Sequence, residues 1–298
     1  MGLATFLATF LVLFPATSVA AVWATEPIRL TLWPQGAPEP SGFVPGPEHT
    51  TPPRDGAQTR LMNVAEPTIS IYRPALPNGT TVVVAPGGAY AFLAIEHEGT
   101  RVCERLGPLG LTCVLLRYRV PSRSPADPGR EALQDAQRAM GLLRNRGAEW
   151  GINPDRIGFL GFSAGGHLAV SMALAANQRS YPFQQGLDAN DATPNFVVPV
   201  YPAYLVDPAD PQRLRADIKV TRAAPPVCLV HADDDKGPST SAGSALLYLE
   251  YKRLDLPAEL HIYAKGGHGF GLKPLALPAA DWLQRVVEWM GAMGWVKP

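Results

Sequence analysis

The chain has 298 residues, of which 46% are hydrophobic, and this is enough to form one large core in a single α/β domain. Its 26 basic and 26 acidic residues balance, which argues against nucleic acid or an anionic membrane surface as a partner. A neutral or weakly charged small molecule fits this composition better.

The first 24 residues predict a secretory signal peptide. They contain no charged side chain, are apolar over residues 3–14, and end in small residues. These features predict cleavage near Ala20 or Ala24 and a secreted or periplasmic protein that has no membrane contact after cleavage. Because no Lys or Arg precedes the apolar run, an uncleaved membrane anchor is the alternative, although Pro15 would make a poor spanning helix.

Residues 25–298 are expected to form one domain, which begins with a proline-rich segment at 34–67 that predicts an exposed loop. After this loop, strand-like and helix-like segments alternate. The predicted strands cover 67–74, 80–86, 111–118, 156–161, 195–202, 225–232 and 258–264, and the predicted helices cover 98–110, 127–151, 163–178, 244–254 and 279–293. Such alternation is typical of an α/β fold with a mostly parallel sheet and helices on both faces.

The three cysteines are interpreted as small buried side chains. Cys103 and Cys113 are the near pair that an exported protein could oxidise, but both lie in apolar surroundings, which favours buried thiols. The third cysteine is Cys228. No metal-binding spacing exists among the three, and neither a metal nor an organic cofactor is predicted.

A G-x-S-x-G pattern lies where the strand at 156–161 meets the following helix. The segment "GFSAG" would hold Ser163 on a tight turn at the carboxyl end of a parallel strand, which is where ligands bind in such sheets. The pattern alone is a weak signal, but a strand directly before it and a helix directly after it favour a nucleophile over an ordinary turn.

A serine nucleophile needs a base, and His268 is the preferred candidate. It lies in "AKGGHGFGL", a glycine-flanked loop after the last predicted strand. His231 and His261 are interpreted as partners in local hydrogen bonds. His97 is a candidate substrate contact, because it follows the loop after the strand at 80–86.

The carboxylate that orients the base is expected between the serine and the histidine in sequence. The segment "VCLVHADDDKGPS" supplies Asp233, Asp234 and Asp235 after the penultimate strand. Asp235 is preferred over Asp234. A solvated loop or a weak calcium site are the alternative interpretations, but the spacing is not that of a calcium-binding loop.

Small residues near two strand ends predict an oxyanion hole. One donor is the backbone N–H of Ala164, at a helix N-terminus whose dipole favours negative charge. The second is the N–H of Gly88 or Ala89 in "VVVAPGGAYAF". Pro86 replaces the histidine of the HGGG form of this motif, and a main-chain donor does not depend on that side chain.

These motifs together resemble the bacterial α/β-hydrolase esterases related to acetyl xylan esterases and feruloyl esterases. The likeness covers nearly all of the mature chain and is carried by seven ordered segments, "APGGAY", "IEHEG", "LLRYRVP", "ALQDAQRAM", "NPDRIGFLGFSAGGHLA", "HADDD" and "AELHIYAKGGHGFGL". The resemblance implies Ser163 as nucleophile, Asp235 as orienting acid and His268 as base, with the oxyanion region at Gly88, Ala89 and Ala164. Relatives often have Val-Pro after the acid, whereas Lys-Gly-Pro follows here, so Asp234 stays open as the alternative.

Short connections predict an open site without a large cap. Few residues separate the strands at 195–202 and 225–232, and no long helical insertion follows the strand at 111–118. Candidate wall residues, whose aromatic members are equally suited to core packing, are Tyr90, Phe92, Glu96, His97, Tyr204 and Phe270.

The resemblance implies a serine carboxylesterase that acts through an acyl-enzyme and removes acetyl or a similar small acyl group from a plant cell-wall carbohydrate such as xylan. Its partner would be an acylated carbohydrate or another small ester. The alternatives are a broad-specificity or feruloyl esterase, a peptidase of the prolyl-oligopeptidase type, which "GFSAGGH" also resembles, and an inert polysaccharide-binding relative.

Overall fold

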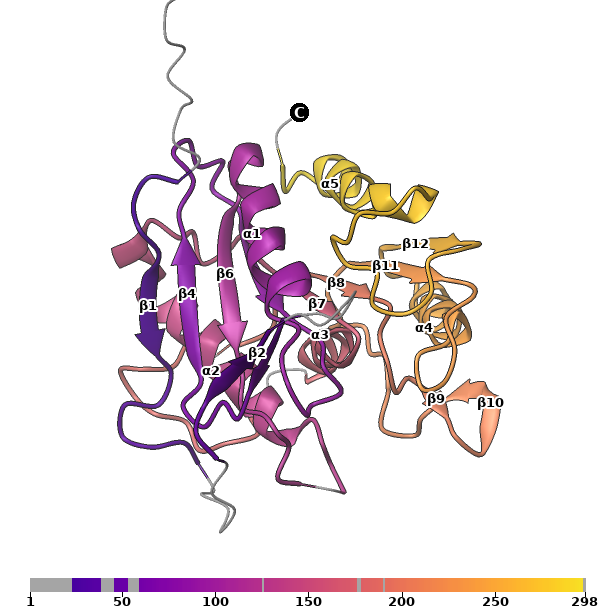
Figure 1. Cartoon of the computed structure of the whole chain (residues 1–298), viewed down its shortest axis with the longest axis horizontal. Helices are drawn as coiled ribbons and strands as arrows, with labels where there is room; N and C mark the ends of the chain where they lie inside the picture. Colours follow the sequence, from indigo (N-terminus) through magenta and orange to yellow (C-terminus); the bar gives the residue numbers. More distant parts are fainter. Residues whose placement is uncertain are drawn as a thin grey trace, which may run out of the picture.

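The computed structural model describes residues 23–38, 46–52, 59–124, 126–175, 178–189 and 191–296 (Figure 1). The predicted signal peptide therefore lies outside the described residues, except for Trp23 and Ala24. The N–H of Ala24 donates to the carbonyl of Arg73 at 2.8 Å, and Trp23 forms a bridge with Pro74. These two residues therefore pair with the domain.

A sheet of eight strands forms the centre of the molecule, with the first half of the chain on the left of Figure 1 and the second half on the right. Only β1 and β4 run antiparallel to their neighbours, and all the other neighbouring strands are parallel, which confirms the predicted mostly parallel sheet. In their spatial order the strands are β1 (Ile28–Thr31), β4 (Thr68–Tyr72), β6 (Thr112–Arg117), β5 (Thr81–Ala85), β7 (Ile157–Phe162), β8 (Phe196–Val200), β11 (Val227–Ala232) and β12 (Ala258–Tyr263).

Helices cover both faces of this sheet, as the alternating pattern predicts. The central strand β5 shows why, because Val83 and Ala85 enter one hydrophobic core while Val82 and Val84 enter the other. A run of β-branched residues buried on both faces is typical of a parallel strand. The first core is covered by α2 (Arg130–Arg146), α3 (Ala164–Leu174) and α4 (Ser241–Arg253), and the second by α1 (Arg101–Leu106) and α5 (Trp282–Ala292).

Part of the proline-rich segment at 34–67 has regular structure, which corrects the expectation of a loop throughout. Strand β2 (His49–Thr51) pairs with β3 (Arg60–Met62) in an antiparallel ribbon. Leu61 is buried, and its backbone exchanges hydrogen bonds with Leu93 at 2.8 and 2.9 Å. Tertiary contact with the loop after β5 therefore holds a strand that the prolines obscure in the sequence.

The remaining short elements lie in the connections. The hairpin of β9 (Val206–Asp207) and β10 (Asp210–Leu214) occupies the link between β8 and β11, where a large cap would otherwise be inserted. A π-helical turn, η1 (Glu96–Thr100), leads directly into α1. The 3₁₀ turns are η2 (Gly107–Leu109), η3 (Gly147–Trp150) and η4 (Pro278–Asp281).

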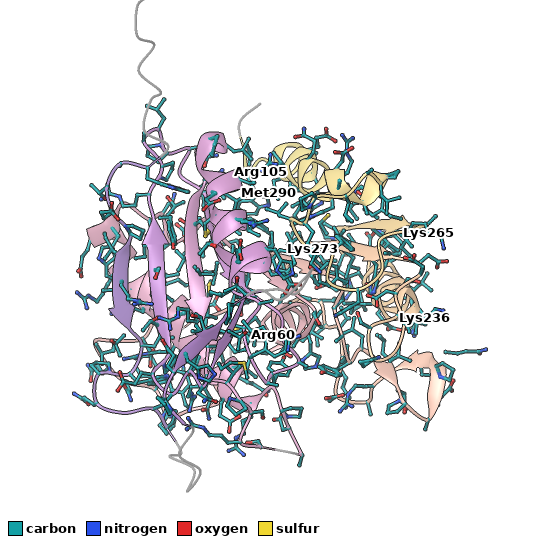
Figure 2. The ribbon with its side chains drawn as sticks, in the orientation of Figure 1. Arg60, Arg105, Lys236, Lys265, Lys273 and Met290 are labelled. Atoms are coloured by element: carbon teal, nitrogen blue, oxygen red, sulfur yellow. A yellow bond between two sulfur atoms is a disulfide. The ribbon has the colours of Figure 1, made fainter. Side chains whose placement is uncertain are left out.

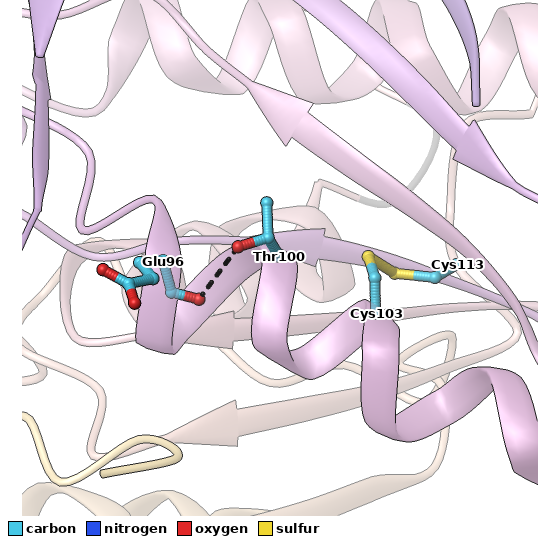
Figure 3. The surroundings of a disulfide bond; sticks show 4 residues. All are labelled: Glu96, Thr100, Cys103 and Cys113. Carbon is cyan, nitrogen blue, oxygen red and sulfur yellow. Dashed lines mark hydrogen bonds between the residues drawn. A yellow bond between two sulfur atoms is a disulfide. The ribbon is translucent and has the colours of Figure 1, made fainter. Parts of the chain in front are cut away.

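Cys103 and Cys113 form a disulfide bond, so the expectation of two buried thiols is wrong (Figure 3). Helix α1 carries Cys103 and packs against β6, which carries Cys113, and this return of the chain brings the two sulfur atoms together. An apolar environment favours a buried thiol and a buried disulfide equally, so the surrounding residues could not separate the two. Cys228 is a buried free thiol, as expected.

Within the described ranges, no helix combines the length and the hydropathy that a membrane crossing requires.

Candidate active site

Ser163 lies on a strained turn between β7 and α3. Its φ and ψ are 53° and −115°, a conformation that costs about 1–3 kcal/mol for a residue with a side chain. A Cβ at Gly161 would lie 1.9 Å from the carbonyl oxygen of Gly165, and one at Gly165 would lie 2.2 Å from that of Ala85. Only glycine therefore fits on either side of the turn, and this close packing holds Ser163 at the carboxyl end of the sheet.

The structure brings Ser163, His268 and Asp235 together from three separate loops. Ser163 Oγ lies 2.8 Å from His268 Nε2, and His268 Nδ1 lies 2.8 Å from Asp235 Oδ2. A proton on Nδ1 is donated to the carboxylate, which leaves Nε2 free to accept the serine hydroxyl proton. The side chain of His268 is 44% exposed, whereas Ser163 and Asp235 are buried.

Asp235 is held as an anion by its neighbours. Burial by itself raises the pKa of this carboxyl group, but the adjacent imidazoles of His231 and His268 outweigh that effect and lower the pKa to about 2. Oδ2 also accepts a hydrogen bond from Ser239 Oγ at 3.1 Å and lies 3.3 Å from His231 Nε2. A carboxylate that stays ionised at neutral pH fixes the tautomer of the base and stabilises its protonated form.

The other two aspartates face different partners. Asp234 Oδ1 accepts the backbone N–H groups of Gly266 and Gly267 at 3.0 and 2.8 Å, and the N–H of Gly267 is the main cause that lowers its pKa. Lys265, on the right of Figure 2, lies with its Nζ 3.7 Å from Asp234 Oδ2. Asp233 Oδ1 accepts the hydroxyl of Ser241 at the start of α4. Asp234 therefore shapes the loop that carries His268, and Asp235 contacts the imidazole.

The glycine loop, Gly87, Gly88 and Ala89, which is expected to supply oxyanion donors, packs against Ser163. A Cβ at Gly87 would lie 2.8 Å from the Cβ of Ser163. The next residues, Gly88, Ala89 and Tyr90, have φ values of 134°, 54° and 57°. In the described chain the N–H groups of Gly88 and Ala89 donate to no protein acceptor, and Ala164 is the first residue of α3, where N–H groups lack intrahelical partners.

A tyrosine and histidine cluster forms one side of this region. The hydroxyl of Tyr90 is 2.8 Å from His167 Nδ1, and the Tyr90 ring stacks on Tyr204 at 6.2 Å between centroids. Burial raises the pKa of Tyr90 well above its ordinary value and lowers that of His167 to about 4. Both groups are therefore neutral at neutral pH. Tyr90 is only 1% exposed, so the expectation that it lines an open wall is wrong. Tyr204 and His167 are partly exposed, and Tyr204 is the predicted wall residue of this cluster that a substrate could contact.

The other predicted wall residues divide into two groups. Phe92 is half-buried beneath Arg60, labelled in Figure 2, whose guanidinium carbon lies 4.5 Å from the ring centroid. Glu96 is partly exposed and accepts a hydrogen bond from Thr59 Oγ1 at 2.6 Å. His97 and Phe270 are only 4% and 1% exposed, so the expectation that they line an open wall is wrong; both pack inside the molecule.

Two buried residues next to the site, Tyr201 and Glu98, are not predicted from the sequence. The Tyr201 hydroxyl donates to Glu98 Oε1 at 2.9 Å, and the Tyr201 ring meets the His268 ring edge-on at 5.3 Å. Glu98 Oε2 accepts the N–H of Gly87 at 2.8 Å. The position of Tyr201 directly after β8, at the carboxyl end of a parallel strand, is the signal that could have identified it.

One group of potential metal ligands occurs among the described residues, at the opposite ends of β11 and β12 from the loops of Asp235 and His268. Ligand atoms of Cys228, Glu259 and His261 lie within 4.8 Å of one another. His261 Nε2 is 2.7 Å from Glu259 Oε1, and burial raises the pKa of the Cys228 thiol. Burial therefore favours the protonated thiol, and a metal bound here would have to displace that proton.

Comparison with known proteins places these features in context. A family described as having the alpha/beta hydrolase fold matches residues 82–234. The chain is 26% identical over 221 residues to an acetylxylan esterase of Xylanibacter ruminicola, covering 67% of this chain and 43% of the relative. It is 32% identical over 135 residues to the esterase LipQ of Mycobacterium tuberculosis, covering 44% and 31%.

A solved structure is similar over a larger share of this chain. The acetyl ester-xyloside bifunctional hydrolase from Caldicellulosiruptor lactoaceticus is 30% identical, with a TM-score of 0.65, and the match covers 86% of this chain and all of that one. By contrast, the chain spans less than half the length of the two curated relatives described above.

Proposed function

This chain belongs to the alpha/beta hydrolase family, and from that premise we propose that it is a carboxylic ester hydrolase that uses Ser163 as its nucleophile. The observation that carries the proposal is the continuous hydrogen-bonded series from Ser163 through His268 to Asp235, at 2.8 Å for each contact. A serine hydroxyl is a weak nucleophile at neutral pH, and this arrangement supplies the base it needs.

In the proposed reaction His268 Nε2 takes the proton from Ser163 Oγ as the oxygen attacks the ester carbonyl. The negative charge of Asp235 stabilises the imidazolium that forms. His268 then donates that proton to the leaving alcohol, and an acyl group stays on Ser163. A water molecule repeats the same proton transfers in the second half of the reaction and releases the acid.

The developing oxyanion would be held by main-chain donors. The N–H groups of Gly88, Ala89 and Ala164 are the candidates, because the glycine loop packs against Ser163 and Ala164 begins α3. Donors fixed in advance by a strained loop need no reorganisation when charge develops, and one such donor contributes about 10²–10³ in kcat.

We propose acetyl groups on a plant cell-wall carbohydrate of the xylan type as the substrate. The names of two similar proteins, an acetylxylan esterase and an acetyl ester-xyloside hydrolase, support this choice. The exposed imidazole and the short β9–β10 hairpin support it as well, because a bulky polymer needs an open approach to the serine.

The experiment measures acetate released from acetylated xylan by the full chain, alongside ferulate released from a feruloylated sugar and hydrolysis of a dipeptide anilide. We expect acetate release to be fastest, and Ser163→Ala to reduce it by about 10⁴-fold or more. Ser171→Ala, on the same helix, is the matched control and should keep wild-type activity.

The outcomes separate the parts of this proposal. Faster release of ferulate or of the anilide would reject the acetyl substrate in favour of a feruloyl esterase or a peptidase. Turnover that is unchanged in Ser163→Ala would reject the serine mechanism itself.

We also propose that the protein is exported after cleavage of its N-terminal segment. The Cys103–Cys113 disulfide supports this, because such bonds persist in oxidising compartments and are rare in the cytosol. N-terminal sequencing of the protein recovered outside the cytoplasm tests it, and an intact Met1 would contradict cleavage.

A further inference from the structure

The proposed mechanism leaves one buried acidic side chain beside the site without a role. Glu98 is 3% exposed and lies in the π-helical turn η1, between the glycine loop and α1. Insertions of this kind in helices are found frequently at functional sites. Burying a carboxyl group costs free energy unless hydrogen bonds compensate, so the partners of Glu98 indicate what it contributes.

Both carboxyl oxygens of Glu98 bind groups that belong to the site. Oε2 accepts the N–H of Gly87 at 2.8 Å, and Oε1 accepts the hydroxyl of Tyr201 at 2.9 Å. His97 Nε2 lies 3.4 Å from Oε1. One side chain therefore connects the glycine loop after β5 with the residue that follows β8.

The contact with Gly87 fixes the loop at its closest approach to the nucleophile. A Cβ at Gly87 would meet Glu98 Oε2 at 2.7 Å and the Cβ of Ser163 at 2.8 Å, so the bare Gly87 backbone is held between these two side chains. Gly88 and Ala89 follow immediately, and their N–H groups are the proposed oxyanion donors. A shift of the Gly87 backbone would therefore also move the N–H groups of Gly88 and Ala89.

The backbone of this loop is strained and needs external support. Ala89 and Tyr90 both have positive φ, which costs about 1–3 kcal/mol for each residue and persists only where surrounding contacts enforce it. The N–H of Ala94 donates to the Gly87 carbonyl at 2.9 Å, so the two polar groups of Gly87 are held, one by backbone and one by Glu98. Removing Glu98 would leave a buried N–H unpaired and free this end of the loop.

The second contact reaches the base. The Tyr201 ring packs edge-on against His268 at 5.3 Å. The single hydroxyl proton of Ser239 is shared between the Tyr201 carbonyl at 2.8 Å and Asp235 Oδ2 at 3.1 Å. Glu98 therefore lies on a network that touches the glycine loop, the base and the acid.

We propose that Glu98 is a positioning residue that sets the geometry of the oxyanion donors by holding the Gly87 N–H, and that it ties this loop to the His268 side of the site through Tyr201. The inference rests on the proposed ester hydrolysis and adds to it a residue that touches neither substrate nor reacting atoms.

The test compares Glu98→Ala and Glu98→Gln in p-nitrophenyl acetate hydrolysis by the full chain. We expect Glu98→Ala to lower kcat by about 10²-fold with KM within about twofold, because the donors act in the transition state rather than in substrate binding. Glu98→Gln keeps an oxygen that can accept the Gly87 N–H, so it should retain kcat within about fivefold. Neither substitution should move the midpoints of the pH–rate profile.

Asp188→Asn is the matched control for a merely structural carboxyl group. Asp188 is 4% exposed, and, like Glu98, it accepts a tyrosine hydroxyl, that of Tyr181, and a backbone N–H, that of Gln184. It also pairs with Arg138 at 2.8 Å. We expect Asp188→Asn to lower the thermal unfolding midpoint while kcat of the folded protein stays unchanged.

Several results would overturn the proposal. They are a folded Glu98→Ala protein with wild-type kcat, a loss confined to KM, or a shifted pH profile that would make Glu98 a titrating participant. If Glu98→Ala does not fold, Glu98→Asp decides, since its shorter side chain cannot span from Gly87 to Tyr201, and wild-type kcat there would reject the role. The two proposals can fail separately. If Ser163→Ala loses activity while the Glu98 variants keep wild-type activity, the proposed function stands and only the role of Glu98 is rejected.

Discussion

Three consecutive aspartates follow β11, and each makes a different set of contacts. Asp233 binds Ser241, Asp234 binds the backbone of the loop before His268, and Asp235 binds the imidazole itself. The carboxylate next to the imidazole determines which ring nitrogen carries the proton. The three aspartates therefore differ in the direction in which each side chain points, and not in residue type.

Asp235→Asn should lower kcat by about 10³–10⁴-fold, because an amide can stabilise the wrong tautomer of His268 and carries no charge to offset the imidazolium. Asp233→Asn, two residues away, should keep wild-type kcat. Steady-state hydrolysis of p-nitrophenyl acetate by both variants checks this. A larger loss in Asp233→Asn than in Asp235→Asn would contradict the assignment of the acid.

The sequence predicts those candidate site residues that lie in a recognisable local motif. Ser163 and His268 are identifiable because a glycine-rich turn after a strand and a glycine-flanked loop after the last strand are local patterns. Glu98 and Tyr201 are not, because their partnership joins residues that lie 103 positions apart. The sequence wrongly predicts Tyr90, His97 and Phe270 as wall residues, because local sequence does not show which way a side chain points.

At the scale of elements, the turn from β7 to α3 depends on the absence of side chains at two glycines. The carbonyl of Gly165 occupies the space where a Gly161 side chain would begin, and the end of β5 occupies that of Gly165. Strand β7, helix α3 and strand β5 are therefore packed backbone to backbone around Ser163.

Gly161→Ala should destabilise the fold by about 3 kcal/mol or more and abolish esterase activity, since its Cβ would lie 1.9 Å from a backbone oxygen that cannot move independently. Gly291→Ala in α5 is the control, because the nearest atom to its Cβ is 3.9 Å away and alanine favours a helix. Urea unfolding measures both. A Gly161→Ala protein as stable as wild type would show that the turn can relax.

The elements that the sequence predicts well are those buried on both faces. A continuous β-branched run such as that of β5 is typical of a parallel strand. The long helices are predictable for a different reason, because their apolar residues recur on one helical face that covers the sheet. The two hairpins were missed because their strands are short, are rich in proline or aspartate, and are stabilised by contacts with distant segments rather than by their own pattern.

At the scale of the whole molecule, the disulfide ties a covering helix to the central sheet. Cys103 lies on α1 and Cys113 on β6, the strand next to β5, and Figure 3 shows the bond together with the adjacent end of η1. Helix α1 continues directly from η1, the turn that carries Glu98. The bond therefore restrains the start of α1, directly after the turn that carries Glu98.

Replacing both Cys103 and Cys113 by serine should lower the free energy of unfolding by about 2–4 kcal/mol, because the cross-link restricts the unfolded chain. Chemical denaturation of the double variant, and of wild type with and without reductant, measures this. Unfolding curves of wild type that are identical with and without reductant, under conditions that release both thiols, would contradict the expected contribution.

The overall architecture was predictable because one alternation of strand and helix runs through most of the chain, and the order of its motifs matches that of one family. Whether the two near cysteines are bonded was not predictable, because it depends on how α1 returns to β6 and not on their apolar neighbours.

The exposed face of His268 would have a consequence for the second half of the proposed reaction. Its side chain is 44% open to solvent, so the imidazole can activate whichever hydroxyl arrives at the acylated serine. In dilute solution that hydroxyl would belong to water, and in a concentrated sugar mixture the hydroxyl of a neighbouring glycan would compete with it. Such an open catalyst would then move acyl groups from one saccharide to another, and the balance between cleavage and synthesis would follow the composition of the medium.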